Sequence, residues 1–159
     1  MGSLITPQLN TRDFNRVKPE YALASKMSVA RVKGQEVSLG RSPVLILDIS
    51  ANGLRFQSHL KIAPNPSILF SFSTLIMGKC LTVYGYIIRM KKIDTKIIDL
   101  YEYGVKFQIG QPAQSQLFKL LNYFSLELRK TPLVQNCKFI IKDGKKYFMH
   151  LHFKGLLGK

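Results

Sequence analysis

Six short segments in the first two thirds of the chain predict β-strands. In the first, residues 21–32, apolar side chains recur at mostly two-residue intervals, which is the period of a strand with one buried face. The later segments are separated by turns rich in Gly, Pro and Lys and span residues 44–47, 54–57, 68–75, 81–90 and 97–109. Six short strands at this spacing predict a mainly β fold, either an antiparallel barrel or a sandwich.

A helical period follows Pro112. Five apolar residues fall on one helical face: Leu117, Leu120, Leu121, Phe124 and Leu128. Pro112 suits the first turn of such a helix, and the basic residues 129–130 suit the last. A helix with one apolar face needs a surface to cover, and the open end of a barrel would provide one. Strands and helix together predict one domain over residues 21–130.

The residues after this helix predict an added β-hairpin, within an extension of residues 131–159. Apolar and basic residues alternate over residues 137–142 and again over 146–154, with Asp143-Gly144 between them as a turn. A two-stranded hairpin is marginally stable alone in water, so we expect it to pack on the domain or on another chain. The sequence therefore leaves open whether the protein forms a homodimer.

The first 20 residues and the net charge suggest how the chain meets other molecules. Residues 1–20 are polar and contain Pro7 and Pro19, which predicts an extended arm. Lys and Arg total 24 against 9 Asp and Glu, a net charge of +15. This excess favours anionic partners such as nucleotides, nucleic acid or acidic lipid.

Several classes of function are not expected. The chain has no G-x-S-x-G, H-E-x-x-H or P-loop motif, so we predict no catalytic residues and no enzyme activity. His150 and His152 lack an evident third ligand, and Cys80 and Cys137 are isolated, so neither a metal nor a cofactor is expected. The chain shows neither a secretory signal nor an apolar run of about 18 residues, which predicts a cytoplasmic protein with no membrane span.

Arg12 and Arg16 form an R-x-x-x-R motif in the arm. A spacing of four places both side chains on one side of the segment, whether it is helical or extended. Two guanidinium groups there can bind a phosphate bidentately, reach the O6/N7 edge of guanine, or stack on a base. Chance alone would give such a pair about 0.3 times in this composition, so the motif is weak on its own.

A second motif, D-x-S-x-x-G, lies between two predicted strands and comprises Asp48, Ser50 and Gly53. Asp48 offers an acceptor for a guanine N–H or an arginine, and Ser50 offers a hydroxyl. Gly53 is expected to allow a left-handed turn and the close approach of a ligand. Chance would give this motif only about 0.025 times.

The two motifs in this order resemble the PilZ domain, the family of cyclic di-GMP receptors. The resemblance runs from Thr11 to Ile109 and includes Leu81-Thr-Val-Tyr-Gly-Tyr-Ile-Ile-Arg89 and Tyr103-Gly-Val-Lys-Phe107, which look like the closing strands of the barrel. It implies a six-stranded antiparallel barrel with a C-terminal helix. It also implies a cyclic di-GMP site formed by the five motif residues Arg12, Arg16, Asp48, Ser50 and Gly53.

The resemblance further implies how such a receptor works. The arm would fold over the ligand and present a new surface to an effector protein that the sequence does not identify. Many members carry another arginine directly before the first motif arginine, and Thr11 in that position favours a single bound ligand. The gap between the motifs is somewhat long, and residues 33–43 account for it.

Two other functions compete with this interpretation. The basic stretch Arg89-Met-Lys-Lys92, with Lys96 and many aromatic residues, would suit a barrel that binds single-stranded nucleic acid. A PilZ-like protein–protein adaptor without a ligand is the other alternative. The presence of both motifs favours the receptor.

Overall fold

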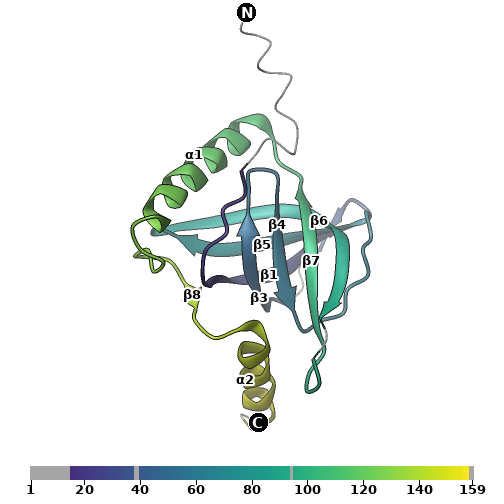
Figure 1. Cartoon of the computed structure of the whole chain (residues 1–159). Coiled ribbons are helices and arrows are strands. Elements are labelled where there is room, and N and C mark those ends of the chain that lie inside the picture. Colours follow the sequence, from purple (N-terminus) through teal and green to yellow (C-terminus); the bar gives the residue numbers. More distant parts are fainter. Residues whose placement is uncertain (1–14, 38–39, 94, 158–159) are drawn as a thin grey trace, which may run out of the picture.

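The computed structural model describes residues 15–37, 40–93 and 95–157, with side chains described as far as Leu151. The strands are β1 (Ala22–Val32), β2 (Gln35–Glu36), β3 (Ser42–Ile49), β4 (Gly53–Ser58), β5 (Ile68–Ile76), β6 (Lys79–Ile93), β7 (Leu100–Phe107) and β8 (Phe139–Ile140). The helices are α1 (Gln111–Leu128) and α2 (Gly144–Leu157). In Figure 1, α1 lies above the strands and α2 below them.

Six antiparallel strands close into a barrel, as the sequence predicts. Hydrogen bonding follows the order β1-β3-β4-β7-β6-β5, and β5 pairs with β1 to close the ring. The short strands β2 and β8 both pair with β1 outside that ring. Side chains alternate along the strands, so that Leu54 and Phe56 of β4 are fully buried while Arg55 and Gln57 lie on the outer surface.

Aromatic side chains form the centre of the barrel. The Phe56 ring lies 5.1 Å from the ring of Phe72 and 4.9 Å from that of Tyr103, measured between centroids. All three residues are at most 1% exposed. The Tyr103 hydroxyl accepts a hydrogen bond from the Ile62 amide and donates one to the Leu60 carbonyl, which satisfies the polar end of this side chain.

The helix expected after Pro112 is confirmed. Gly110 caps α1, and Pro112 lies in its first turn, where no intrahelical N–H bond is lost. Leu117, Leu121 and Phe124 are buried against the barrel core. The helix therefore covers one end of the barrel, as its single apolar face predicts.

The predicted tail hairpin is wrong. Its first half is reduced to β8, which pairs with residues 22–23 of β1, and its second half is the helix α2. Asp143 is an N-cap rather than a turn residue, because its carboxylate accepts the Lys146 amide at 2.8 Å and its carbonyl accepts the Tyr147 amide at 3.0 Å. Phe148 is 1% exposed and packs with Leu45 and Leu100.

The physical reason is an ambiguous apolar pattern. Leu151 follows Tyr147 by four residues and Phe148 by three, so a helix brings the three side chains onto the same side of the chain. The barrel offers an apolar surface to that face, and no neighbouring strand is needed for the backbone bonds of a helix. Neither helix in the described part of the chain is long and apolar enough to span a bilayer.

Candidate functional site

The N-terminal segment meets β3 beside the second motif. Val17 and Ile49 form an isolated antiparallel bridge, in which the Val17 amide donates to the Ile49 carbonyl at 2.8 Å and the Ile49 amide donates in return at 3.0 Å. Val17 is 7% exposed and belongs to the main core. The bridge fixes Arg16, the preceding residue, at the surface next to Asp48.

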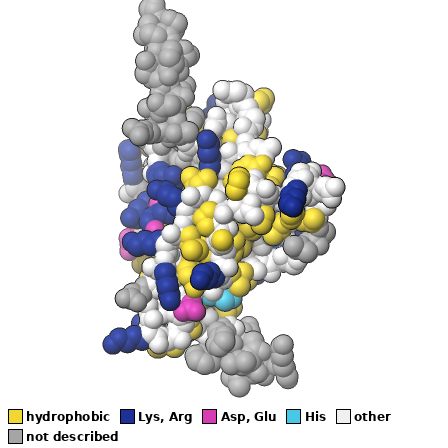
Figure 2. All heavy atoms as spheres, turned by 90° about the vertical axis from the view of Figure 1, so that its right-hand side faces the viewer, with side chains coloured by type: hydrophobic (Ala, Val, Ile, Leu, Met, Phe, Trp, Pro, Cys, Tyr) yellow, Lys and Arg dark blue, Asp and Glu magenta, His cyan; other side chains and the backbone are white. Residues whose placement is uncertain are grey.

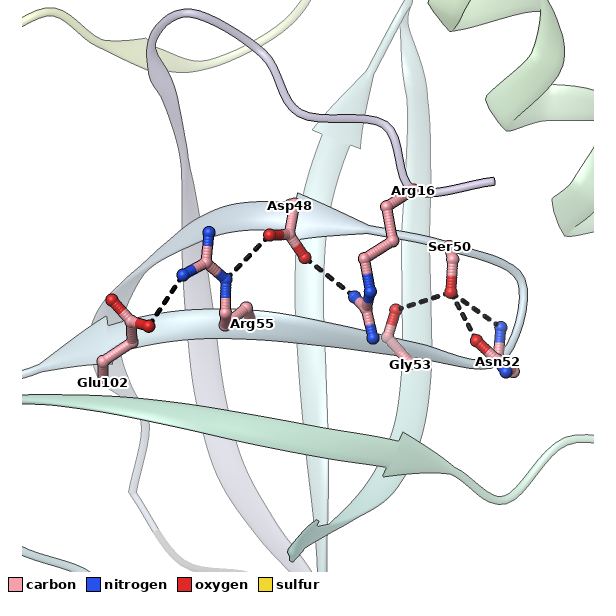
Figure 3. Close-up of polar contacts among 7 residues, drawn as sticks. All are labelled: Arg16, Asp48, Ser50, Asn52, Gly53, Arg55 and Glu102. Atoms are coloured by element: carbon pink, nitrogen blue, oxygen red, sulfur yellow. Dashed lines mark hydrogen bonds and ion pairs between the residues drawn. The ribbon is translucent and has the colours of Figure 1, made fainter. Parts of the chain in front are cut away.

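Four charged side chains of alternating sign form a row across this surface. Nη1 of Arg16 lies 2.8 Å from Oδ1 of Asp48, and Nε of Arg55 lies 2.7 Å from Oδ2 of the same carboxylate. Nη1 of Arg55 continues the row to Oε2 of Glu102 at 2.7 Å. Figure 3 shows the row running from the N-terminal segment through β3 and β4 to β7. We call these four residues the charge row.

Burial differs along the charge row. The Asp48 side chain is 6% exposed, that of Arg55 is 31% exposed and that of Arg16 is 45% exposed. Burial disfavours the charged form of Arg55, but its hydrogen bonds to Asp48 and Glu102 outweigh burial and raise the pKa of its guanidinium above the ordinary value. Arg55 is therefore a fixed cation held by two carboxylates, while Arg16 keeps much of its guanidinium accessible.

Ser50 is fully buried and holds the turn between β3 and β4. Its amide donates to the Gly53 carbonyl at 2.8 Å, and its hydroxyl donates to Oδ1 of Asn52 at 2.5 Å. The same hydroxyl oxygen accepts the Asn52 amide at 3.3 Å. Figure 3 shows the hydrogen bonds of the Ser50 hydroxyl within the turn beside Arg16. In this conformation the Ser50 hydroxyl shapes the turn, and its contact with a ligand stays a prediction.

Gly53 is required for a reason other than the expected one. Only Gly34 and Gly78 have a positive φ among the glycines that the structure describes, so the expected left-handed conformation of Gly53 is wrong. A Cβ atom at Gly53 would instead lie 2.3 Å from the carbonyl oxygen of Val105 on β7. The glycine allows β4 and β7 to pair at the normal distance next to the turn.

The structure brings four of the five motif residues together and leaves one outside the described residues. Arg16 contacts Asp48, and Ser50 and Gly53 form the turn that follows. Arg12 lies outside the described residues. The R-x-x-x-R pair as a whole therefore stays a prediction.

Arg55 and Glu102 are site residues that the sequence analysis missed. Arg55 stands opposite Asp48 in the β3–β4 register, directly after a bulge that shifts the pairing between Ile46 and Asp48. Glu102 reaches the row from β7, far away in the sequence. Arg55 follows Gly53 by two residues and so shares the outward face of the strand, which is the one local signal that could have indicated it.

A hollow of about 600 Å³ adjoins the charge row on β6 and β7 and is lined in part by Arg55, Glu102 and Arg89. Gly104 pairs with both Arg55 and Arg89 in register, and a Cβ atom on it would lie 2.9 Å from Nε of Arg89. The Arg89 guanidinium thus covers this glycine. Figure 2 shows that Lys and Arg side chains crowd one side of a face of the molecule and that acidic side chains are few there.

The described residues contain no cluster of three or more His, Cys, Asp or Glu side chains that could hold a metal ion. Both cysteines are free, with Cys80 exposed and Cys137 partly buried. Burial raises the pKa of the Cys137 thiol, although its sulfur accepts a hydrogen bond from the Met77 amide at 3.2 Å. The Cys137 side chain packs against the main core.

Comparison with known proteins identifies the fold. No protein-family model and no curated protein matches the sequence. The structure is similar to apo MrkH of K. pneumonia, with a TM-score of 0.55 and 17% identity over 77% of this chain and 54% of MrkH. It is also similar to the PilZ domain of Escherichia coli YcgR solved with c-di-GMP, with a TM-score of 0.53 and 11% identity over 76% of this chain and 96% of that domain.

A third similar structure is MotI/DgrA, the inhibitor of motility of Bacillus subtilis, with a TM-score of 0.51 and 14% identity over 74% of this chain and 52% of MotI. The chain thus spans about half the length of MrkH and of MotI. At these identities the similarity establishes the fold. The chain has a PilZ-like domain, a closed six-stranded barrel with a helix after its last strand.

Proposed function

We propose that this protein is a receptor for cyclic di-GMP and that it binds the ligand on the outer surface of the barrel, between residues 12–16 and the turn at 48–53. The proposal is supported by the PilZ-like fold together with the two motifs of the sequence. One of the similar structures, the YcgR domain, is a complex with this nucleotide. The ligand has two phosphates and two guanines, which match the chemistry of the motif residues.

The observation that carries the proposal is the contact between Arg16 and Asp48. The contact brings Arg16, the second residue of the first motif, onto Asp48 of the second, and this supports a site formed by both. Arg16 is 45% exposed and can turn towards a phosphate, whereas Arg55 stays on Asp48 and keeps its charge balanced. Each carboxylate oxygen has a second lone pair, so Asp48 can still accept a guanine N–H.

Binding acts on a partner through the segment before Arg16. The arm predicted from the sequence, most of which lies outside the described residues, would fold over the ligand, and an effector protein would recognise the surface so formed. The receptor has no catalytic step, so the nucleotide is released unchanged. A receptor for an intracellular messenger of this kind works in the cytoplasm.

Calorimetry with an Arg16→Ala variant tests the proposal. We expect the wild type to bind cyclic di-GMP in preference to its linear form and to cyclic di-AMP. Loss of a charge-assisted contact to phosphate weakens binding by about 10- to 100-fold. Arg129→Ala is the matched control, because it removes the same charge from an exposed position after α1 and is expected to bind normally.

Two outcomes would contradict the proposal. If Arg16→Ala binds as tightly as the wild type, the site assignment is wrong. If the wild type prefers single-stranded oligonucleotides, with an affinity that grows with their length and falls steeply with salt, the protein is a nucleic-acid-binding barrel instead.

A further inference from the structure

A second polar hollow lies on the outer face of β1, β5 and β6. Its volume is about 740 Å³, within the range of small-molecule sites, and none of the charge row residues lines it. The β1–β2 hairpin forms part of its wall through Glu36 and Val37, and Gln108 borders it after β7. We call this hollow the hydroxyl groove, after the side chains of its floor.

The floor of the hydroxyl groove is built by strand register. Two cross-strand rows run over β1, β5 and β6, and they consist of Lys26, Ser73 and Thr82 in one row and Ser28, Ser71 and Tyr84 in the next. The hydroxyls of Ser73 and Thr82 lie 3.1 Å apart and share a hydrogen bond. Because adjacent strands are about 4.8 Å apart, the rows place several hydroxyls within reach of a single ligand.

Cations surround this floor. Lys26, Arg31 and Arg41 are exposed and line the groove, where Glu36 is the one carboxylate. Arg31 and Glu36 are partners in the β1–β2 register, yet they form no ion pair. None of the three cations is in an ion pair with any residue for which the structure gives a position. With three cations against one carboxylate, the lining of the groove carries a net positive charge that attracts anions.

These features limit the chemistry of the ligand. Hydroxyls both donate and accept hydrogen bonds, which suits the hydroxyls of a sugar and the oxygens of a phosphate. A protein partner would need a central cluster of apolar or aromatic anchors, and a nucleic-acid strand would need several stacking platforms. The groove offers one exposed aromatic side chain, Tyr84, at 45% exposure.

We propose that the hydroxyl groove binds a small phosphate ester, either a sugar phosphate or a mononucleotide. Arg31 and Arg41 hold the phosphate, and the two rows of β1, β5 and β6 hold the sugar hydroxyls. Tyr84 provides a surface for the sugar ring or the base. This site lies on other strands than the proposed cyclic di-GMP site, and the two proposals stand independently of each other.

Amide NMR titration tests the proposal with the full chain. The titration uses the Arg16→Ala background, so that the proposed cyclic di-GMP site is weakened. Probes are GMP, glucose 6-phosphate and inorganic phosphate. We expect GMP or glucose 6-phosphate to shift the amides of Ser28, Ser71 and Thr82 in a saturable manner, and to bind more tightly than inorganic phosphate. The ester that binds more tightly identifies the ligand as a nucleotide or as a sugar phosphate.

Variants separate a built site from general attraction by charge. Arg31→Gln combined with Arg41→Gln is expected to weaken binding of the ester at least about tenfold, since two charge-assisted contacts are lost. Lys145→Gln combined with Lys146→Gln removes two exposed charges from α2 and is the matched control, expected to bind within about twofold of the parent. Ser71→Ala is expected to weaken binding of the esters but not binding of inorganic phosphate.

Three outcomes would overturn the proposal. The first is that neither ester shifts the groove amides. The second is that the arginine pair and the lysine pair weaken binding equally, which would indicate general attraction by a basic surface. The third is that inorganic phosphate binds as tightly as the esters, which would assign no role to the hydroxyl rows.

Discussion

Asp48 forms ion pairs with Arg16 and Arg55, and its side chain is only 6% exposed. A buried carboxylate is stable only when its charge is matched and its oxygens are hydrogen-bonded, and Arg16 and Arg55 do both. The residue therefore has a structural role in the barrel as well as the proposed role in ligand recognition. Substitutions at this position report on both, and stability has to be measured beside binding.

Asp48→Asn is expected to destabilise the protein. The amide cannot match the charge of Arg55, and its NH₂ group would face the donors of an arginine. The expected loss is about 1–3 kcal/mol in the free energy of unfolding. Urea denaturation monitored by circular dichroism measures it. Asp99→Asn is the control, because the Asp99 side chain is 71% exposed and its pair with Lys92 spans 3.8 Å, so little change is expected. Equal losses for the two variants would contradict the role of the charge row.

Tyr103 makes stability depend on pH in the alkaline range. Burial raises the pKa of its phenol above 10.0, and the hydrogen bond from the Ile62 amide opposes this only in part. Because the unfolded chain releases the phenol proton first, the contribution to stability is complete below about pH 10 and is lost as the pH rises through the higher pKa of the folded state. Urea denaturation between pH 8 and 11 checks this.

The control for that measurement is Tyr103→Phe. The variant loses stability at all pH values because the Ile62 amide and the Leu60 carbonyl lose their partner. Its stability should nevertheless fall less steeply above pH 10 than that of the wild type, since the titrating group is gone. Parallel curves for the two proteins would show that other groups cause the decline.

The helix α2 is the element that the sequence misrepresents, and one side chain carries its attachment. Phe148 is 1% exposed, and its ring also contacts the rings of His59 at 5.4 Å and Tyr147 at 5.1 Å. It is the one α2 residue in the buried cluster with Leu45 and Leu100, among the side chains that the structure describes.

We therefore expect Phe148→Ala to lower the free energy of unfolding by about 3–5 kcal/mol, or to release α2 while the barrel stays folded. Circular dichroism and limited proteolysis after residue 142 measure the two outcomes. Lys145→Ala, exposed on the same helix, is the control and should be neutral. An unchanged stability of Phe148→Ala would mean that α2 does not depend on this contact.

The barrel was predictable from the sequence, whereas the tail was not, and the reason lies in the contacts that each pattern requires. Alternation in β4 and β7 matches one buried and one exposed face, so the strands follow from local sequence. Apolar residues at 147, 149, 151 and 153 fit a strand, whereas those at 147, 148 and 151 fit one face of a helix, and Asp143-Gly144 suits a turn as well as an N-cap. Packing against the barrel surface favours the helix, and that surface forms only when the strands have folded.

The same distinction applies to the candidate site. Asp48, Ser50 and Gly53 are close together in the sequence and form a local turn, so a motif could identify them. Arg55 and Glu102 meet through the register of β4 with β7, and a bulge in β3 sets which side chain faces Asp48. Pairing register and bulges are properties of the folded sheet.

At the scale of the whole molecule, β1 pairs with four of the other strands. It closes the barrel with β5, pairs with β3 on the other side, and carries β2 and β8 at its ends. It also forms one side of the hydroxyl groove, while β3, its neighbour, carries Asp48. The hydroxyl groove therefore includes β1, and the proposed cyclic di-GMP site includes β3, which pairs with β1.

Hydrogen exchange resolves how binding of cyclic di-GMP would change the molecular surface. We expect saturating ligand to slow exchange at residues 8–16, because closure of this segment over the ligand protects its amides. The amides of Val17 and Ile49 serve as the internal control. They already donate to each other's carbonyls at 2.8 and 3.0 Å, so the ligand should change their exchange much less.

Slower exchange confined to residues 8–16, with no change at Val17 and Ile49, would mean that the barrel does not change conformation. The new surface would then be the closed segment itself. Cyclic di-AMP should give no protection there, since Asp48 would find no guanine N–H to accept. If cyclic di-GMP binds in calorimetry but exchange at residues 8–16 is identical with and without it, the segment does not transmit the signal, and the effector must recognise the bound nucleotide on the barrel surface.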